Sequence, residues 1–477
     1  MSLHAQDVPN AANFLPSPPS SQSYKFKNDS AQYELSKELR TTARGEKARS
    51  DMSWQLNTYL SNFSEIMGVE LSVKNTPNIY ELCNYGMTQA TKSIEASQAA
   101  RFSWRPYARF GEASLITSSE EQYRSTSSYP SAQAVYGWLL GILLSEVNSD
   151  RQDQLLKRAY DMGYSSVIAG YNWQSDTEIG RDLASAVLAN IHSHNGFLSL
   201  VRYAQAEFNK KAGTRASDDP FLYANALPDP TKYLPDPPAE GTAQYEYDVK
   251  TYNESKTYRD TSRGDMAVSD ADASLENMIR IFSPLLGVTI SSSNTPEIYT
   301  LLSRIFPVAT QSSSEAKEHY NRRRPYVVFD EHTGYPAEED ELRNNGAYPS
   351  GHSLLGWLVG LTLSEINPAN MESIMSRAYE FGQSRVILGY HWQSDVTTGR
   401  YVAGAAFGRL HLESDFLNQL ERAIKEFKST SAIHDAVATS EESEASAPVY
   451  TLEGHRLDSR PTRPGIYIRR GKKMIIR

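Results

Sequence analysis

Apolar residues recur along most of this chain with the three- and four-residue spacing of helices. Segment 353–365 carries leucines at this spacing and stops at Asn367-Pro368, where a proline ends the helical pattern. Gly356 and Gly360 interrupt the segment, which indicates close packing against another helix. Similar helical patterns occupy 275–286, 371–381 and 397–420. Alternating strand patterns of convincing length do not occur in the sequence before residue 445, so the pattern predicts an all-α fold.

The chain also aligns with itself. Asn75-Thr-Pro-Asn-Ile-Tyr80 recurs as Asn294-Thr-Pro-Glu-Ile-Tyr299, and Tyr171-Asn-Trp-Gln-Ser-Asp176 recurs as Tyr390-His-Trp-Gln-Ser-Asp395. Both pairs are separated by 219 residues, and this offset holds without a gap over most of the length. Such a long period predicts a domain duplication rather than a solenoid. Each copy, of about 200 residues, is long enough to form its own core.

These patterns divide the chain into two helical domains with short connections and a tail. We expect a leader or cloning remnant at 1–13, a first domain at 14–213, a linker at 214–232, a second domain at 233–432, a flexible linker at 433–448 and a basic β tail at 449–477. Within the tail, the stretch 466–476 predicts a β-hairpin around Arg470-Gly471. The predicted fold is therefore two tandem helical bundles plus a short C-terminal hairpin.

Composition narrows the class of protein. The net charge of −9 disfavours a nucleic-acid-binding surface. No run of 18 apolar residues occurs in the sequence, so no membrane-spanning segment is predicted. The single cysteine, Cys83, excludes an intramolecular disulfide, and we interpret it as a buried apolar side chain. These exclusions leave the candidate chemistry of the second copy to indicate the function.

An anion-binding pattern begins at residue 349. Pro349 and Ser350 are typical of a helix start, and Gly351 would let its backbone approach a ligand closely. Free N–H groups at such a helix start bind oxyanions such as phosphate. Arg385 offers a planar fork of donors to the same anion. These residues together predict a phosphate-binding site.

Two histidines and two further cations extend this pattern. His391 and Asp395 are four residues apart, so on a helix they would share a face, and the carboxylate would fix the imidazole tautomer. His352 lies at the predicted helix start, and Lys317 and Arg324 lie upstream. The combination predicts a phosphate pocket that contains a nucleophile and has neither a metal-ligand set nor a cofactor.

The spacing of these residues follows a known order. In sequence it comprises Lys317, six residues, Arg324-Pro325, then Pro349-Ser350-Gly351-His352, then Ser384-Arg385, five residues, His391, three residues and Asp395. This order resembles the three-part signature of the type 2 phosphatidic acid phosphatase superfamily, which includes the vanadium haloperoxidases. The stretches 345–352 and 382–395 resemble more closely the bacterial class A non-specific acid phosphatases. Several spaced blocks make this resemblance more specific than one short motif would be.

The resemblance implies an all-helical bundle and a mechanism. His391 would attack phosphorus to form a phosphohistidine, Asp395 would hold its far nitrogen, and His352 would protonate the leaving alcohol. The phosphate oxygens would be bound by Lys317, Arg324, Ser350, Gly351 and Arg385. The resemblance further implies small phosphate monoesters as substrates, no metal or cofactor, inhibition by vanadate and activity favoured below neutral pH. It also implies export to the periplasm or surface of a Gram-negative bacterium, after removal of a signal peptide.

The first copy lacks most of this pattern. At the 219-residue offset, Lys317, Gly351, His352, Arg385 and His391 are replaced by Gln98, Ala132, Gln133, Ser166 and Asn172. Because both histidines and two of the three cations are missing, the first copy is predicted to be catalytically inactive. The resembling enzymes are usually dimers or larger, so the silent copy would serve as the second subunit of an intramolecular pseudo-dimer.

Other interpretations remain open. A vanadium-dependent haloperoxidase could use the same pocket, and a phosphotransferase would pass the phosphoryl group from histidine to an alcohol. A surface-binding protein is disfavoured, because the second copy kept the positions that the first one lost. We interpret His319 and Arg322-Arg323 as exposed or at the substrate rim, and 330–340, which includes His332, as a solvated loop near the pocket mouth. The tail at 449–477 resembles sorting tails of exported proteins in some Gram-negative bacteria.

Overall fold

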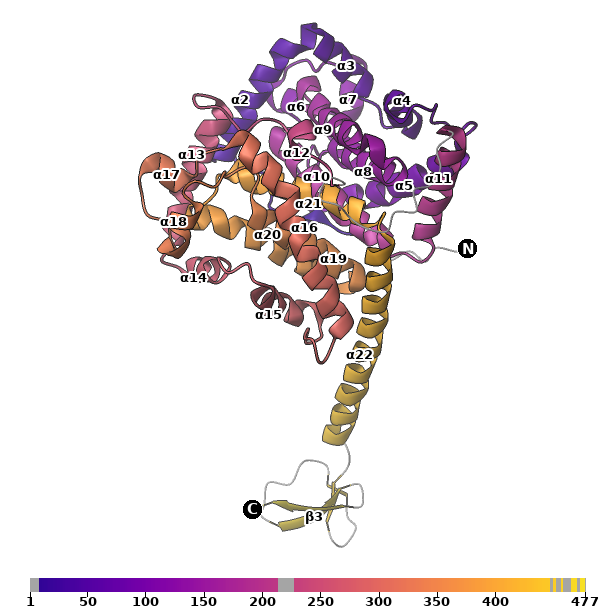
Figure 1. The fold of residues 1–477 in the computed structure, drawn as a ribbon, viewed down its shortest axis with the longest axis vertical. Helices are drawn as coiled ribbons and strands as arrows, with labels where there is room; N and C mark the ends of the chain where they lie inside the picture. The colour runs from indigo at the N-terminus through magenta and orange to yellow at the C-terminus, as the bar shows by residue number, and fades with distance from the viewer. Residues whose placement is uncertain are drawn as a thin grey trace.

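A computed structural model describes residues 8–212 and 227–446, together with four short strands between 449 and 476. Figure 1 shows a body built of packed helices, from which the last helix leads toward the strands. The predicted all-α fold is therefore confirmed. We refer to residues 8–212 as the first half and to residues 227–431 as the second half. Among the described residues, no helix is both long and apolar enough to cross a membrane.

Helices follow one another in the same order in both halves. The first half contains α1 (Ala11–Phe14), α2 (Tyr24–Glu38), α3 (Ala43–Asp51), α4 (Leu56–Met67), α5 (Pro77–Ala100), α6 (Pro106–Phe110), α7 (Glu120–Tyr123), α8 (Ala132–Val147), α9 (Gln152–Ala169), α10 (Gln174–His192) and α11 (Phe197–Ala212). The second half contains α12 (Pro230–Tyr233), α13 (Ala243–Ser255), α14 (Ser262–Ser269), α15 (Leu275–Leu286), α16 (Pro296–Tyr320), α17 (Pro325–Phe329), α18 (Glu339–Leu342), α19 (Gly351–Ile366), α20 (Met371–Leu388), α21 (Gln393–Leu410) and the start of α22 (Ser414–Ser446). Short 3₁₀ turns join some of them: η1 (Leu39–Thr41), η2 (Thr117–Ser119), η3 (Ser149–Arg151), η5 (Lys256–Tyr258), η6 (Pro336–Glu338) and η7 (Pro368–Asn370).

The central helix of each half is α8 or α19. Every residue of α8 is buried, and α19 is buried from Ser353 to its end, as expected of a helix that is apolar on all sides. A Cβ on Gly356 would lie only 2.7 Å from the ring of Phe381, and one on Gly360 only 2.6 Å from the Ala378 Cβ. Both contacts are made with α20. The close helix packing predicted from these glycines is confirmed.

The two halves contact each other through corresponding helices. α10 packs on α19 while α21 packs on α8, and α10 and α21 also pack on each other; all four lie in the centre of the body in Figure 1. Arg400 on α21 donates from Nε to Asp182 Oδ2 on α10 at 2.7 Å, and both side chains are buried. Trp138 and Tyr401 also meet here, with ring centroids 5.9 Å apart. Contacts in which each half uses the same surface are typical of a twofold interface.

Two expected segment boundaries near the ends of the halves differ from the structure. The start of the chain was interpreted as a remnant up to residue 13, but Ala11 is fully buried in α1. The Asn10 N–H also donates to Glu372 Oε1 of the second half at 3.0 Å, so this segment belongs to the packed body. The linker expected at 214–232 ends earlier, because α12 begins at Pro230; residues 213–226 lie outside the described part of the chain.

Two expectations at the C-terminal side also need correction. The helix expected at 397–420 is two helices, because α21 ends at Leu410 and α22 begins at Ser414, where Ser and Asp favour a new start. The flexible linker expected at 433–448 is helical as far as Ser446. The stretch 414–446 contains neither glycine nor proline and is rich in Ala and Glu, which favours continuation of the helix.

The C-terminal tail contains a small antiparallel sheet. Its strands are β1 (Val449–Thr451), β2 (Arg456–Leu457), β3 (Gly465–Arg469) and β4 (Lys472–Ile476), in the order β2-β1-β3-β4. β3 and β4 pair with Arg469 opposite Lys472, as the predicted hairpin requires; Arg470 and Gly471 themselves lie outside the described residues.

The buried ion pair between the halves predicts a large effect on stability. Replacing Arg400 with Met leaves the fully buried Asp182 carboxylate without its partner, so we expect a loss of about 3–5 kcal/mol of unfolding free energy. The measurement is urea unfolding followed by circular dichroism. As a control, Arg422→Met removes an exposed pair with Glu297 and should leave the midpoint nearly unchanged. Equal effects of both substitutions would contradict the prediction.

Candidate functional site

The start of α19 forms one wall of the candidate site. Ser350 caps this helix, and its N–H donates to the Asp395 main-chain carbonyl at 2.9 Å, which ties the starts of α19 and α21 together. Gly351 follows at the first helical position, and a Cβ built on it would meet no atom closer than 3.9 Å. The nearest charged side chain is that of Lys317, whose Cε would lie 4.0 Å away. The helix start is therefore uncrowded on the side that faces Lys317.

A tight turn between α20 and α21 places the histidine opposite this wall. Gly389 ends α20 with a φ of +91°, a conformation that glycine adopts without strain. The chain reverses direction there, and the His391 N–H donates to the Arg385 carbonyl at 3.3 Å. His391 therefore precedes Trp392, the N-cap of α21. We expected His391 and Asp395 to lie on one helix. Asp395 lies on α21, but His391 lies in the turn that Gly389 begins, before the helix starts.

His391 and Asp395 nevertheless meet. His391 Nδ1 lies 3.3 Å from Asp395 Oδ2, and His391 Nε2 lies 3.1 Å from a terminal nitrogen of Arg324. Burial, followed by the nearby Arg324 and Lys317, holds the pKa of His391 well below its usual value. The ring is therefore neutral: Nδ1–H donates to the carboxylate, and the Nε2 lone pair faces Arg324.

Asp395 is held by several donors. Its Oδ2 accepts from the Trp392 N–H at 2.8 Å, and its Oδ1 accepts from Arg322. Burial raises the pKa of Asp395 to about 6, although Arg322 opposes this shift. The carboxylate thus carries its charge above about pH 6 and loses it below.

Two buried arginines supply donors for an anion. Arg385 is fully buried and donates to Glu338 Oε2 at 2.8 Å, whereas its Nε and Nη1 have no hydrogen-bond partner among the described residues. Arg324 is also buried, and it donates to main-chain carbonyls and to the Asn345 side chain. Burial lowers the pKa of Arg385 and brings that of Arg324 to about 10. Both groups are charged near neutral pH, and Arg385 keeps unused donors.

Lys317 completes the set of cations from the end of α16. Its Nζ donates to the Gly346 carbonyl at 2.8 Å. Burial, reinforced by Arg324, lowers the pKa of Lys317 to about 7. This amine therefore gains its charge as the pH falls through neutrality, or when an anion binds beside it.

His352 occupies the second position of α19. Its Nε2 lies 2.9 Å from the Ala271 carbonyl oxygen, and its ring stacks on Phe381 with centroids 5.9 Å apart. Burial and the positive charge of Arg385 hold the pKa of His352 well below its usual value. His352, which the resemblance expects to give a proton to the leaving alcohol, is therefore neutral in the structure, because burial and these cations disfavour a positive charge on the ring.

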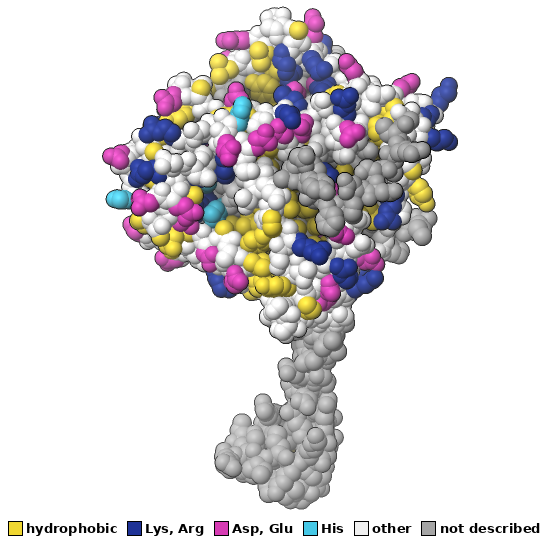
Figure 2. All heavy atoms as spheres, viewed as in Figure 1, with side chains coloured by type: hydrophobic (Ala, Val, Ile, Leu, Met, Phe, Trp, Pro, Cys, Tyr) yellow, Lys and Arg dark blue, Asp and Glu magenta, His cyan; other side chains and the backbone are white. Residues whose placement is uncertain are grey.

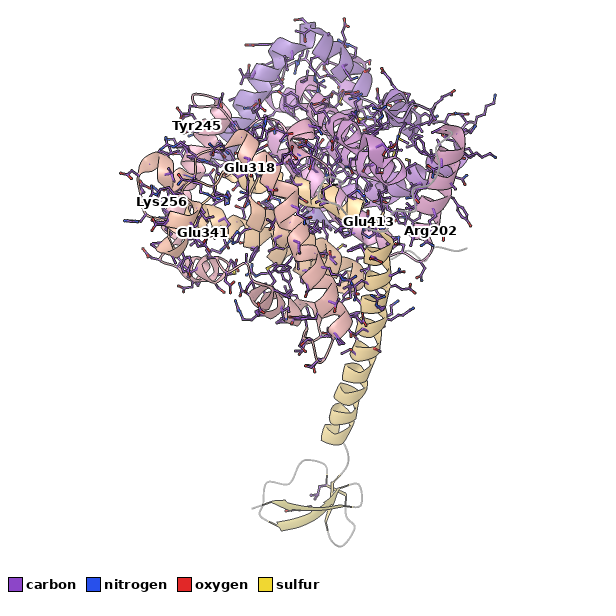
Figure 3. All side chains as sticks on the ribbon, viewed as in Figure 1. Arg202, Tyr245, Lys256, Glu318, Glu341 and Glu413 are labelled. Atoms are coloured by element: carbon purple, nitrogen blue, oxygen red, sulfur yellow. The ribbon has the colours of Figure 1, made fainter. Side chains whose placement is uncertain are left out.

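A cavity of about 720 Å³ opens beside Lys317, Gly351 and His352. In Figure 2 a hollow with an adjoining histidine lies next to a strip of hydrophobic side chains. Apolar residues contribute part of the wall, namely Ala273, Phe306, Ala309 and Leu355. Glu318, which lies on α16 and is labelled in Figure 3, also lines the cavity. The cavity thus combines a charged end with a wall of mixed apolar and polar side chains, the latter including Thr310, Ser313 and Asn345.

Sequence reasoning missed some residues of this site. Arg322 was interpreted as exposed or at the rim, but it forms ion pairs with both Asp395 and Asp248. Glu338 was placed in a solvated loop, yet it binds Arg385. One signal could have identified Arg322: the corresponding residue of the first half is Ser103, so the arginine occurs only beside the histidines. Of the remaining expectations for this loop and spacer, exposure is correct for His319 and His332.

Glu339 also departs from the solvated loop that was expected. Its carboxylate is buried and accepts from the N–H and hydroxyl of Thr333. The segment is thereby folded against the body, since a buried carboxylate requires such donors.

At the corresponding place in the first half, several side chains donate to main-chain carbonyls of their own half, whereas the Gln133 amide and Asn172 Oδ1 have no hydrogen-bond partner among the described residues. Arg105 donates to the main-chain carbonyls of Tyr171 and Ser127 at 3.0 and 2.9 Å. Asn172, which replaces the histidine, donates to the Ser128 carbonyl at 2.6 Å. Ser166, which replaces the second arginine, donates to the Gly163 carbonyl. These groups stabilise their own half.

Comparisons with known proteins point in one direction. The family model of the PAP2 superfamily matches residues 298–415. A non-specific acid phosphatase of Salmonella typhimurium is 42% identical over 195 residues, which are 41% of this chain and 78% of that protein. A non-specific acid phosphatase of Providencia stuartii is 42% identical over 208 residues, which are 43% of this chain and 84% of that protein. An acid phosphatase of Zymomonas mobilis is 32% identical over 200 residues, or 42% of this chain and 76% of that protein.

The pKa of Lys317 predicts how anion binding depends on pH. Sulfate keeps its charge between about pH 6 and 8.5, so a change in its affinity over this range reflects titration of groups on the protein. The amine is protonated below about pH 7 and neutral above. Raising the pH from about 6 to 8.5 should therefore lower the affinity for sulfate roughly tenfold. Isothermal titration calorimetry is the measurement.

Two variants identify the titrating group. Lys317→Met should bind sulfate weakly, with little dependence on pH, whereas Lys425→Met, which alters an exposed lysine, should behave as the unmodified protein. If Lys317→Met kept the full pH dependence, another group would be responsible.

Proposed function

Because the chain belongs to the bacterial non-specific acid phosphatases of the PAP2 superfamily, a group of hydrolases, we propose that its second half hydrolyses small phosphate monoesters through a phosphohistidine. The observation that carries this proposal is the arrangement of His391 between Asp395 and Arg324. One ring nitrogen is held by a carboxylate, and the other presents its lone pair at a cluster of cations. A neutral imidazole with an oriented lone pair is the state that attacks phosphorus.

The cations would hold the phosphoryl group for this attack. A phosphate beside His391 Nε2 would accept from Arg324, from the unpartnered nitrogens of Arg385 and from Lys317. Charge on the equatorial oxygens must be balanced throughout the transfer, and fixed donors in a buried site do so without reorganisation. Ser350 and the Gly351 N–H would add neutral donors. In this mechanism these side chains balance the phosphoryl charge, and no metal or cofactor is assigned a role.

His352 would act as the proton donor to the leaving alcohol and then as the base for water. Burial, followed by the charges of Arg385, Arg324 and Lys317, holds the pKa of His352 well below its usual value. A phosphate dianion would offset these charges and raise the pKa of His352. Binding of the substrate would therefore favour protonation of this histidine. Activity below neutral pH follows from this coupling, since protonated Lys317 and His352 are both favoured there.

The wall of the cavity supports a broad choice of leaving group. Beyond the phosphate end, Phe306, Ala309 and Leu355 offer apolar contact to the remainder of a substrate, and small polar side chains such as Thr310 and Ser314 also line the cavity. Apolar contacts discriminate weakly between molecules of similar size. The same pocket would accept orthovanadate, whose trigonal-bipyramidal adduct with histidine resembles the transition state.

We assign the first half a structural role, as the silent partner in an intramolecular pseudo-dimer. The hydrogen bonds that Arg105 and the Asn172 amide nitrogen donate to main-chain carbonyls of their own half support this role, as do the reciprocal contacts of α8 and α10 with α21 and α19. We also propose that the protein is exported, with the basic strands of the tail as a sorting element, by analogy with the tails it resembles. The periplasm or cell surface of a Gram-negative bacterium would be its location.

The first test is phosphate release from an aryl phosphate at about pH 5–6 in the presence of a chelator. Replacing His391 with Asn copies the residue found at Asn172 of the first half and should lower kcat more than about a thousandfold, because the nucleophile is lost. Wild-type enzyme quenched in alkaline detergent should carry a covalent, acid-labile phosphoryl group that the variant lacks.

The matched control is Asn172→Ala, which should retain both activity and the phosphoenzyme. Full activity of His391→Asn would overturn the assignment. Absence of phosphatase activity, together with halide oxidation once vanadate and peroxide are supplied, would identify a haloperoxidase instead. Faster alcohol production with added glycerol would indicate phosphotransfer from the same intermediate.

A second test uses Arg322, which lies outside the phosphate cluster. Its charge lowers the pKa of Asp395, so Arg322→Met should raise this pKa further. The acid limb of the kcat/KM profile, which reports the free enzyme, should move upward by about one pH unit. The exposed neighbour Arg323 provides the control, since Arg323→Met should leave the profile in place. An unshifted limb in Arg322→Met would show that Asp395 does not set it.

A further inference from the structure

A second cluster of histidines lies where the two halves meet, away from the phosphate cluster. His192 at the end of α10 and His411 just after α21 face each other, with ring centroids 3.8 Å apart. Glu146 on α8 and Glu365 on α19 flank them. The two histidines are 219 residues apart, as are the two glutamates. Each half therefore contributes one glutamate and one histidine to a shared centre.

The ring nitrogens of this cluster are oriented as metal ligands are. His411 Nδ1 lies 2.8 Å from the Phe407 carbonyl, which fixes it as the protonated nitrogen and leaves Nε2 toward Glu365 at 2.9 Å. In metal-binding histidines, the ring nitrogen that does not bind the metal usually donates its N–H to a carbonyl or carboxylate. His192 Nε2 lies 3.1 Å from Glu146 Oε1. Both Nε2 atoms thus face carboxylates of their own half.

Distances and burial favour a small cation. Ligand atoms of His192, Glu365 and His411 all lie within 4.8 Å of one another. In tetrahedral zinc sites, ligand atoms about 2.1 Å from the metal are roughly 3.4 Å from one another. Modest rotation of the three side chains would bring their ligand atoms to this spacing. The side chains are nearly inaccessible, and Glu146 Oε2 has no hydrogen-bond partner among the described residues. A buried carboxylate oxygen without a donor is costly, and a cation would compensate it.

We propose that Glu146, His192, Glu365 and His411 bind one divalent transition-metal ion of the Zn²⁺ type, which joins the two halves. Two imidazoles and two carboxylates suit such an ion, and the two negative charges balance it. Binding displaces the protons that now connect each Nε2 to its carboxylate, as metal binding generally does. Four protein ligands leave no open position, so the ion is structural.

This site is separate from the phosphate cluster. His352 is the second residue of α19 and Glu365 is the last but one; the 13 helical steps from one to the other correspond to about 20 Å. Figure 3 labels Glu413, two residues beyond His411, beside the junction of α22 with the body. Loss of the ion should therefore loosen the contact between the halves while kcat of the folded enzyme stays unchanged.

The test uses the full chain without a histidine tag. After dialysis against chelator, Zn²⁺ at about a hundredfold above its Kd should raise Tm by roughly 3 °C, and the retained metal should approach one ion per chain. Co²⁺ should give the visible absorption band of a tetrahedral site with nitrogen and oxygen ligands. Phosphatase activity, measured alongside, is expected to be the same with and without metal.

Two variants and a control decide the outcome. Glu146→Gln keeps the size of the side chain and His411→Asn removes a ligand; both should fold, as judged by circular dichroism, and both should lose the Co²⁺ band and the Tm shift. The control His194→Asn changes a neighbouring histidine that instead bonds to the Tyr85 hydroxyl, and it should keep both. A wild-type protein without band or Tm shift, or a Glu146→Gln variant that retains them, would overturn the proposal.

Discussion

The buried carboxylate of Asp395 is the interaction on which the candidate site depends. Its oxygens accept from the Trp392 N–H, from Arg322 and from His391, and its main-chain carbonyl accepts from Ser350. One residue therefore sets the start of α21, the start of α19 and the tautomer of the histidine. Burial of this charge is tolerated because each oxygen has donors. Arg322 supplies the positive charge that keeps it ionised above about pH 6.

The first half shows which parts of this arrangement serve the fold alone. Asp176 accepts from the Trp173 N–H at 2.9 Å, and the Ser131 N–H donates to the Asp176 carbonyl at 3.0 Å. These contacts repeat those of the second half, although the histidines, the lysine and one arginine are absent. The helix starts thus remain in register without any catalytic side chain. What distinguishes the second half is the concentration of positive charge, which adds to burial in lowering the pKa of Lys317 and of both histidines.

Sequence patterns predicted the helical class, the central helix and the residues that meet at the site, because spacing and residue type report local structure well. Gly356 and Gly360 indicated a close helix contact that the structure contains. The patterns failed where tertiary contacts decide. Arg322 looked like a surface residue because its partner Asp248 lies 74 positions away. His391 looked helical because its spacing from Asp395 fits a helix, whereas Gly389 imposes a turn. Segment 433–446 looked like a linker by composition, yet nothing in it stops a helix.

The contact between the halves has a consequence for how the protein responds to dilution. In an enzyme assembled from separate chains, a surface such as that of α19 and α21 would become exposed as concentration falls, because association is second order. Here the partner surface on α8 and α10 belongs to the same polypeptide. The covalent connection keeps it at a fixed effective concentration, which dilution does not lower. The fold around His352 and His391 should therefore persist at concentrations where a two-chain counterpart would dissociate.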